Sequence, residues 1–284
     1  MGERKKFEVV DGIRYQKPTV VLLAETGIGV SEVAARTCYD SFCNSENEVV
    51  RSLENELPTE EVLRELNAID DSKLLDDLAW TYFHHSILEH TNLSYLIRGT
   101  SRGVLQEHAR HRIQAISVRS TRYTMSGIVN AYVASLEDLD PREFFFQKVN
   151  GFDMLVTADE EYNRIEIATM FEKFEFQRKR LEDFYFKAVS KSSLPLLDEF
   201  RGNSEALFEA LQNGKKKRNV GDAFKHIVTD NWKVDMVVTF NLRSLKNYLS
   251  LRDSGAAYFQ IRWLAQEMKR VTPKKYLKLI VKEG

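Results

Sequence analysis

The chain gathers cationic side chains in one short stretch. Residues 110–123, Arg-His-Arg-Ile-Gln-Ala-Ile-Ser-Val-Arg-Ser-Thr-Arg-Tyr, contain four arginines, one histidine and three serine or threonine residues, with no acid among them. Arginine cannot lose its proton in a protein, so guanidinium groups this close repel one another unless an anion lies among them. We therefore expect a phosphate or diphosphate to bind here. The alternative is a basic surface stripe whose arginines pair with acids elsewhere in the chain.

A second polar group lies at residues 241–252, which read Asn-Leu-Arg-Ser-Leu-Lys-Asn-Tyr-Leu-Ser-Leu-Arg. If this segment is helical, Arg243 and Asn247 are four residues apart on one face and can contact one ligand together. The leucines of the segment lie on another face, with the spacing of ordinary core packing. The segment is therefore a second candidate for contact with the ligand.

Three histidines and one glutamate form a third group at residues 84–90, His-His-Ser-Ile-Leu-Glu-His. Side chains of these types at short helical spacings can bind a transition metal. The His-Glu-x-x-His arrangement of open metal sites is absent, however, and the strand pattern that follows indicates that the segment leaves its helix midway. We expect no metal here and favour a role in binding a nucleotide or cofactor.

Regular elements must position these polar segments. Alternating and β-branched residues predict strands at residues 18–24, 92–99 and 233–240. Ser31 is expected to cap a helix over residues 32–40. Apolar spacings of three and four residues predict further helices at 56–84, 101–109 and 162–190, and two or three helices over 245–280, divided at Ser254-Gly255 and Pro273.

Length and charge limit the class of protein. A chain of 284 residues allows one large domain or two small ones, and because no repeat or Pro/Ser-rich linker divides it, we expect a single domain over residues 1–284. The 41 Lys+Arg and 42 Asp+Glu leave a net charge of −1, which disfavours a protein that coats nucleic acid. The four cations at 215–218 could attract a phosphate but are interpreted as a solvated loop, because blocks of like charge repel one another and stay in water. RNA binding is not expected there, since no aromatic residue beside them offers a base a stacking partner.

The sequence also predicts a cytoplasmic protein. The longest apolar runs, such as Thr19–Ala24, are far shorter than the ~20 residues that cross a bilayer, and the N-terminus lacks the apolar stretch of a secretory signal. Cys38 and Cys43 are too few for a disulfide framework, so we expect both to be reduced thiols.

Arg110-His111-Arg112, followed by seven residues and then Ser120, resembles the Arg-His-Arg-x7-Ser signature of the flavin-dependent thymidylate synthases, the ThyX family. The resemblance extends to Ser86–His90, to Ser101-Arg102-Gly103 and to the second family motif, Asn241–Leu245 with Leu251-Arg252. It covers roughly residues 18–42, 78–126 and 225–280, in the family's order. The segment at about 127–200 is longer than expected for the family, and the resemblance gives it no role.

The resemblance implies a fold, an activity and an assembly. The fold is α/β in the broad sense, also classed as α+β: a twisted, largely antiparallel sheet surrounded by helices. The activity is the reductive methylation of dUMP to dTMP, with methylenetetrahydrofolate as carbon donor and FAD, reduced by NADPH, as hydride source. Family members form homotetramers whose active sites collect residues from several subunits. Neither cysteine lies in or beside the cationic segments, so a cysteine nucleophile has no candidate here.

The resemblance also assigns residues. FAD would be bound by seven polar residues, with Val118 lining the pocket where other members have Glu: Ser86, Arg110, His111, Arg112, Asn241, Arg243 and Asn247. A histidine of the family near the flavin corresponds to His84. The substrate dUMP would be held by Glu107, Arg110, Ser120, Arg122, Lys225 and Arg252. Arg252 is the expected catalytic residue, because its charge would draw negative charge onto the uracil ring as the hydride arrives.

Several positions depart from the family pattern. Within the signature, this chain has Ala115, Ser117 and Val118 where the commonest form has Ser, Asn and Glu, respectively. Outside it, Glu107 replaces the Gln of many members, and Lys225 replaces an arginine. These substitutions leave one alternative open: an FAD- or nucleotide-binding protein of the same fold whose pyrimidine-methylating activity is lost or altered.

Overall fold

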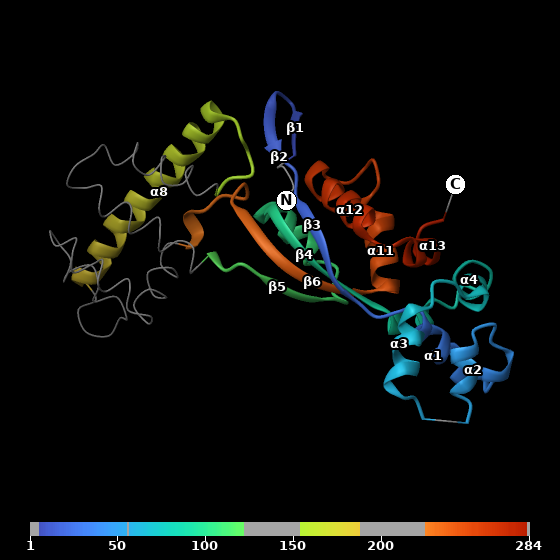
Figure 1. The fold of residues 1–284 in the computed structure, drawn as a ribbon. Coiled ribbons are helices and arrows are strands. Elements are labelled where there is room, and N and C mark those ends of the chain that lie inside the picture. The colour runs from blue at the N-terminus through green and yellow to red at the C-terminus, as the bar shows by residue number, and fades with distance from the viewer. Residues whose placement is uncertain (1–5, 56, 122–153, 188–224, 283–284) are drawn as a thin grey trace. The chain divides into compact units, whose positions relative to one another are not determined.

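A computed structural model of the chain describes residues 6–55, 57–121, 154–187 and 225–282 (Figure 1). The chain divides into two compact units. Unit 1 comprises residues 1–16, 101–103 and 119–234, and unit 2 comprises residues 17–100, 104–118 and 235–284. The expectation of a single domain stays a prediction. Of the predicted features, the cation run at 215–218 lies outside the described residues.

Unit 2 is built on a four-stranded sheet. Its strands are β3 (Thr19–Glu25), β4 (Asn92–Ser101), β6 (Lys233–Asn241) and β5 (Ala115–Val118), in the spatial order β3-β4-β6-β5. β3 pairs antiparallel with β4, and β5 pairs antiparallel with β6. The strand predicted from a β-branched run at 18–24 is confirmed as β3, and those predicted from alternation at 92–99 and 233–240 are confirmed as β4 and β6.

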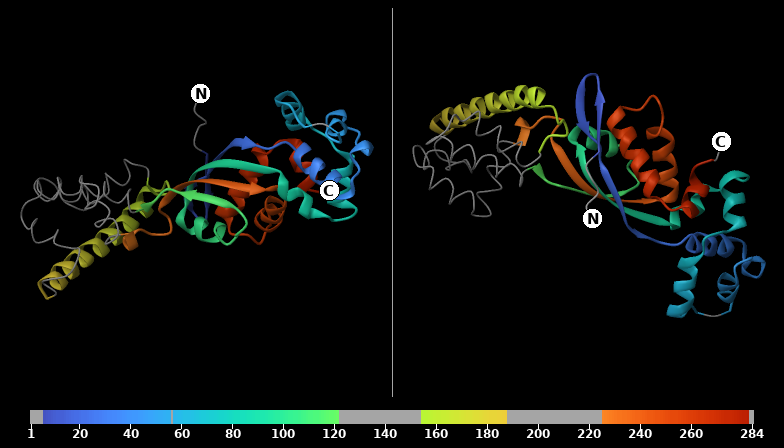
Figure 2. Two further views of the ribbon diagram at one scale, coloured as in Figure 1. Left: turned by 90° about the horizontal axis from the view of Figure 1, so that it is seen from below. Right: turned by 45° about the horizontal axis from the view of Figure 1, so that its top comes forward.

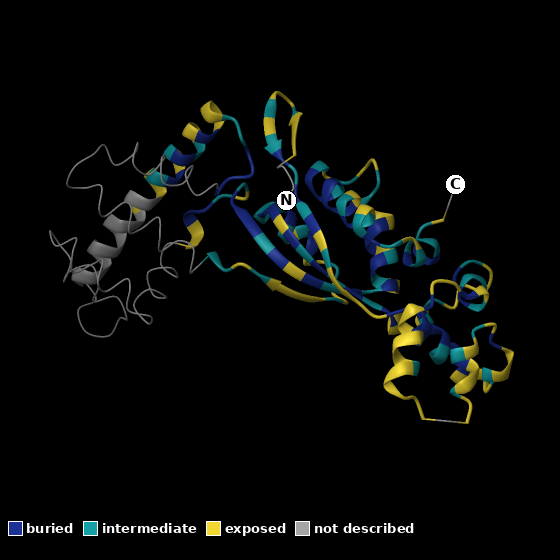
Figure 3. Ribbon diagram, in the orientation of Figure 1, coloured by how far each residue is buried: buried dark blue, intermediate teal, exposed yellow. Residues whose placement is uncertain are grey.

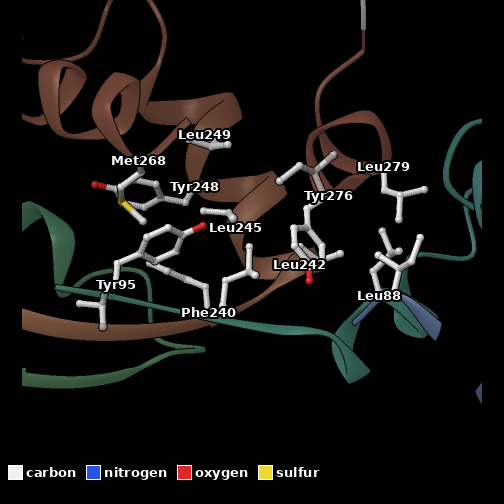
Figure 4. Close-up of a cluster of buried hydrophobic side chains, with 14 of the residues drawn as sticks. Leu88, Tyr95, Phe240, Leu242, Leu245, Tyr248, Leu249, Met268, Tyr276 and Leu279 are labelled. Atoms are coloured by element: carbon white, nitrogen blue, oxygen red, sulfur yellow. The ribbon is translucent and has the colours of Figure 1, made fainter. Parts of the chain in front are cut away.

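Helices cover one face of this sheet (Figures 1 and 2). Inward-facing residues of β3, β4 and β6, such as Val20, Tyr95 and Phe240, are fully buried against them. The core includes α11 (Leu242–Arg252), α12 (Phe259–Val271) and α13 (Lys274–Ile280), whose buried side chains meet Tyr95 and Phe240 in Figure 4. The division of 245–280 into three helices is confirmed. The fold class is confirmed as well, since the structure combines an antiparallel sheet with helices, although these helices cover only one face of the sheet.

The other face of the sheet carries apolar side chains in contact with solvent. Val21 is 47% exposed, Leu23 52% and Val237 37%, and exposed bands on β3, β5 and β6 are visible in Figure 3. Val21 pairs across the strands with Leu96, which is only partly buried. This open sheet face is therefore unusually apolar for a surface in water.

The N-terminal helices of unit 2 differ from the prediction in two places. The helix predicted over 56–84 is instead α3 (Glu60–Ala68) and α4 (Lys73–Trp80), because the Ser72 hydroxyl accepts a hydrogen bond from the Leu75 amide and starts a new helix. The cap predicted at Ser31 is wrong: α1 (Gly29–Tyr39) begins earlier, and the buried Ser31 hydroxyl lies 2.8 Å from that of Thr91.

Short elements complete unit 2. They are η1 (Phe42–Asn44), α2 (Glu48–Ser52), η2 (His85–His90) and α5 (Arg102–His108), of which α5 confirms the helix predicted over 101–109. The start of α1 packs closely on α3, because a Cβ at Gly29 would lie 2.3 Å from the Leu66 carbonyl oxygen. Among the described residues, no helix is long and apolar enough to cross a membrane.

Unit 1 contains a hairpin that the sequence reading did not predict. Strands β1 (Phe7–Val10) and β2 (Ile13–Gln16) pair antiparallel around Asp11-Gly12, both of which have positive φ. The unit also holds η3 (Lys225–Ile227) and α8 (Glu160–Lys187), which confirms the long helix predicted near 162–190. At the start of α8, the Asn163 amide donates to the Thr157 carbonyl at 3.1 Å.

Candidate active site

A cleft of about 1170 Å³ lies within unit 2. It is lined by residues 85, 110–113, 243–244, 246–247, 250–252, 254 and 256–257. Five of the lining side chains are cationic and none is a carboxylate: Arg110, Arg112, Arg243, Lys246 and Arg252. The two cationic segments found in the sequence thus form the walls of one cavity, which is larger than the about 300–1,000 Å³ of an ordinary small-molecule site.

Helix α11 supplies one wall because of its two faces. Asn241 ends β6 and caps the helix, accepting a hydrogen bond from the Ser244 amide at 2.8 Å. Leu245 and Tyr248 are fully buried on the core side, whereas Arg243 and Asn247 line the cleft. The predicted placement of Arg243 and Asn247 on one helix face is confirmed.

The other wall is the segment after α5, which is anchored by His108. This imidazole is fully buried, and its Nδ1 lies 3.1 Å from the Tyr248 hydroxyl. Backbone hydrogen bonds from Arg110 to Glu107 and from His111 to His108 then turn the chain, so that Arg110 and His111 line the cleft. Burial lowers the pKa of His108 to about 4, so the anchor is neutral at physiological pH.

Arg252, at the end of α11, contacts this second wall. Its Nε donates to Nε2 of His111 at 3.0 Å, and Nη1 donates to Oε2 of Glu107 at 2.9 Å. Nη2 donates to the Glu107 carbonyl oxygen at 3.4 Å. A guanidinium has five N–H groups, so these three contacts leave two donors for a ligand. The Arg252 side chain is 18% exposed, which makes the ion pair with Glu107 a partly buried one.

The remaining arginines are open to an anion. Arg110 and Arg112 have no ion pair within the part of the chain that the structure describes, which for these two arginines argues against a basic stripe paired with acids. Arg243 contacts Oε1 of Glu89, but the two side chains are 55% and 43% exposed. An ion pair this exposed contributes little stability, so an anionic ligand can replace Glu89 at low cost.

The sequence matches the family model described as thymidylate synthase complementing protein over residues 21–276. The chain belongs to this family. Over 94% of the chain and the whole of the relative, it is 27% identical to a flavin-dependent thymidylate synthase of Wolinella succinogenes. A Campylobacter jejuni (strain RM1221) enzyme of the same name is 26% identical, over 90% of this chain and 93% of its own. The expected ThyX resemblance is confirmed.

A solved structure shares the fold. Thymidylate Synthase X of Helicobacter pylori, crystallised with FAD and dUMP, superimposes with a TM-score of 0.54 at 23% identity, covering 93% of this chain and 97% of that chain. At this identity the likeness establishes the architecture and leaves the roles of individual residues to the geometry of the site.

Not every residue that the ThyX resemblance assigned lies at the cleft. Ser86 is exposed on η2 outside the lining, and Val118 is half-buried against the core. Asn241 serves as the helix cap, and His84 is exposed just before η2.

The residues assigned to dUMP are also dispersed. Ser120 and Lys225 belong to unit 1, and Arg122 lies outside the described residues. Glu107 contacts Arg252. The described residues contain no group of three or more His, Cys, Asp or Glu placed to hold a metal ion.

Sequence reasoning did not single out Lys246, and it considered His85 only as a member of the group at 84–90 that was expected to help bind a nucleotide or cofactor. The Lys246 ammonium lies 3.7 Å from the centre of the Trp80 ring, 3.1 Å from His85 Nε2 and 3.4 Å from the Ala79 carbonyl oxygen. Burial lowers the pKa of Lys246. The row Arg243, Lys246 and Ser250, spaced three and four residues apart, carried the signal that would have placed Lys246 on the cleft face.

Proposed function

We propose that the chain is a thymidylate synthase that methylates dUMP to dTMP, taking the carbon from methylenetetrahydrofolate and the hydride from FAD that NADPH has reduced. One observation carries this proposal: in a chain of this family, five cations and no acid line one cleft, and an arginine with two free donors lies in its wall. Family membership alone would also be consistent with a protein whose active site had been lost.

The cleft has the size and charge for a dinucleotide. Arg110, Arg112 and Arg243 would bind the FAD phosphates, since charge-assisted hydrogen bonds from guanidinium groups suit phosphate oxygens. Asn247, one turn beyond Arg243 on the same helix face, adds a neutral donor and acceptor. When bound, FAD supplies the hydride that the reaction needs.

Arg252 is the proposed catalytic residue. Its two remaining N–H groups can face the uracil of dUMP and stabilise the negative charge that develops on the ring. The cation is already oriented by Glu107 and His111, so little reorganisation is needed during the reaction. Ser120, Arg122 and Lys225 would hold the phosphate of dUMP, as the family motifs imply.

We include in the proposal a homotetramer with shared active sites and a cytoplasmic location, where nucleotide and folate substrates occur. The open sheet face, with Val21, Leu23 and Val237 exposed, supports association with further copies of the chain. Shared sites also give a role to Ser86, Asn241 and Val118, which lie outside the cleft lining of their own chain and would contact FAD bound to a neighbouring subunit.

The experiment is a comparison of bound flavin with turnover in the purified protein. Flavin absorbance reports the cofactor, and tritium release from [5-³H]dUMP, dependent on methylenetetrahydrofolate and NADPH, reports the reaction. A yellow protein that releases tritium supports the proposal. A yellow protein without release would favour the binding-only alternative, and a colourless protein that FAD does not reconstitute would contradict both.

A further inference from the structure

Arg252 is held by a single turn of chain. Glu107, in the last turn of α5, and His111, four residues later, contact the same guanidinium from one segment. The resemblance assigns Glu107 to dUMP and His111 to FAD. In the structure, however, the functional atoms of both side chains are directed at Arg252, with donor–acceptor distances of 2.9 and 3.0 Å.

The contact with His111 fixes a protonation state. Because Arg252 Nε carries a hydrogen, Nε2 of His111 must accept, and an imidazole accepts only when it is neutral with its proton on the other nitrogen. A protonated His111 would turn an N–H toward the N–H of Arg252 and add a second positive charge beside it. The hydrogen bond and protonation of His111 are therefore mutually exclusive.

The surroundings of His111 favour the neutral form. From α11, Arg252 faces the ring and Tyr248 packs against it edge-on at 4.7 Å between ring centres. From its own segment, Arg110 is the neighbouring cation. His108, whose imidazole is neutral, accepts the His111 amide hydrogen at its backbone carbonyl oxygen. The Glu107 carboxylate is engaged by Arg252. Burial, followed by the charges of Arg252 and Arg110, lowers the pKa of His111.

We propose that Glu107 and His111 are positioning residues for Arg252, and that Arg252 keeps its orientation only while His111 is neutral. The positioning is a property of the chain without FAD or substrate. Its effect on turnover rests on the function proposed above, so the two parts are tested separately.

The first test follows the imidazole of His111 in FAD-free protein by ¹⁵N NMR as the pH is lowered. We expect a neutral ring with the proton on Nδ1 near pH 7 and a pKa below the ordinary 6.5. The Arg252 Nε–H signal should be protected from exchange above that pKa and lost below it. In Arg252→Met, the pKa of His111 should rise toward 6.5, because a cation has been removed. A proton on Nε2 near pH 7 overturns the proposal.

Arg243→Met is the matched control for this test. It removes a cleft arginine of the same helix that does not contact His111, so the pKa of His111 should stay at its parent value. Equal shifts in the two variants would show that general cleft charge, and not the Arg252 contact, sets the state of His111, and would overturn the proposal.

The second test uses the reaction. His111→Gln keeps an acceptor oxygen that does not titrate, whereas His111→Ala keeps none. With Arg252 misaligned, kcat of His111→Ala should fall about 10-fold or more at pH values above the pKa of His111, with KM for dUMP changed less than kcat. In the parent, kcat should fall as the pH is lowered through that pKa, because the protonated ring no longer holds Arg252. The acid limb of the parent kcat profile should disappear in His111→Gln. A His111→Gln protein that loses flavin and keeps the acid limb overturns the positioning role.

The two parts can fail independently. If NMR shows the neutral ring and the protected Arg252 signal while the parent protein releases no tritium from dUMP, the positioning stands and the proposed function fails. If the parent turns over dUMP and the Arg252 signal is unprotected at neutral pH, the reverse holds.

Discussion

The hydroxyl of Tyr248 lies 3.1 Å from Nδ1 of His108, and neither residue is exposed to solvent. Burial raises the pKa of Tyr248 and lowers the pKa of His108 to about 4, so both side chains are neutral near pH 7. Tyr248 also packs against His111, and His108 immediately follows Glu107 in sequence. The buried pair thus links α11 to the segment that begins at the end of α5, which are the two walls of the cleft that Arg252 also connects.

Tyr248→Phe should destabilise the protein by about 1–3 kcal/mol, because the ring remains and a buried imidazole nitrogen loses its partner. Urea unfolding at pH 7.5 measures the change. Tyr39→Phe is the control, since Tyr39 is 64% exposed and should lose almost no stability. Equal effects of the two substitutions would count against the buried hydrogen bond.

Stability should decrease as the pH falls below about 6.5. Between 6.5 and about 4, the unfolded chain binds a proton at His108 that the folded chain does not bind. The free energy of unfolding therefore falls as the pH is lowered through this range, by up to about 3 kcal/mol in total for this group. Urea unfolding at pH 7.5, 6 and 5 tests the slope. His108→Phe, which cannot titrate, should show a smaller slope, and an unchanged slope would contradict the assignment.

Arg110→Ala and Arg243→Ala should each weaken FAD binding. A charge-assisted contact of about 1.5–3 kcal/mol corresponds to a roughly 10- to 150-fold loss of affinity. Flavin titration of the apoprotein, followed by fluorescence, measures the dissociation constant. Arg270→Ala removes an arginine of α12 outside the cleft lining and should bind FAD like the parent. Variants that purify with parental flavin occupancy would remove these residues from the FAD site.

Arg252→Lys should lower turnover about 10²- to 10³-fold while the FAD content hardly changes. Lysine keeps the charge but loses the planar set of donors that meets His111, Glu107 and, by the proposed mechanism, the pyrimidine. KM for dUMP should change less than kcat, since other residues are proposed to hold the phosphate. Near-parental turnover, or joint loss of flavin and dUMP binding, would show that Arg252 has a structural role instead.

The sequence predicted the elements of unit 2 better than the contacts between them. Strands β4 and β6 alternate as a half-buried sheet requires, β3 is a short β-branched apolar run, and the apolar spacing of α11 predicted its cleft-facing side. The break at Ser72 was missed because the leucines on either side of it continue one helical spacing. The hairpin around Asp11-Gly12 was missed although that dipeptide is a strong hairpin signal.

Contacts within the site could not be read from local patterns. Glu107 and Arg252 are 145 residues apart in the sequence, and nothing in either segment identifies the other as its partner. The buried His108 ring contacts the rings of Phe240 on β6 and Tyr248 on α11, both far later in the sequence, and nothing near His108 identifies them as its neighbours. Residue types revealed a cationic site. The tertiary structure was needed to show which of the described cleft cations already contact a protein acceptor and which do not.

The walls of the cleft come from distant parts of the chain, and this fixes when the site can exist during synthesis. The Arg-His-Arg segment leaves the ribosome long before β6 and α11, so β5 lacks the partner strand that joins Ala115 to Thr239. Until α11 is made, the arginines at 110 and 112 belong to no cavity. If FAD binds in this cleft as proposed, its capture is a late step, and a chain that ends before residue 241 would carry the complete signature without the cavity.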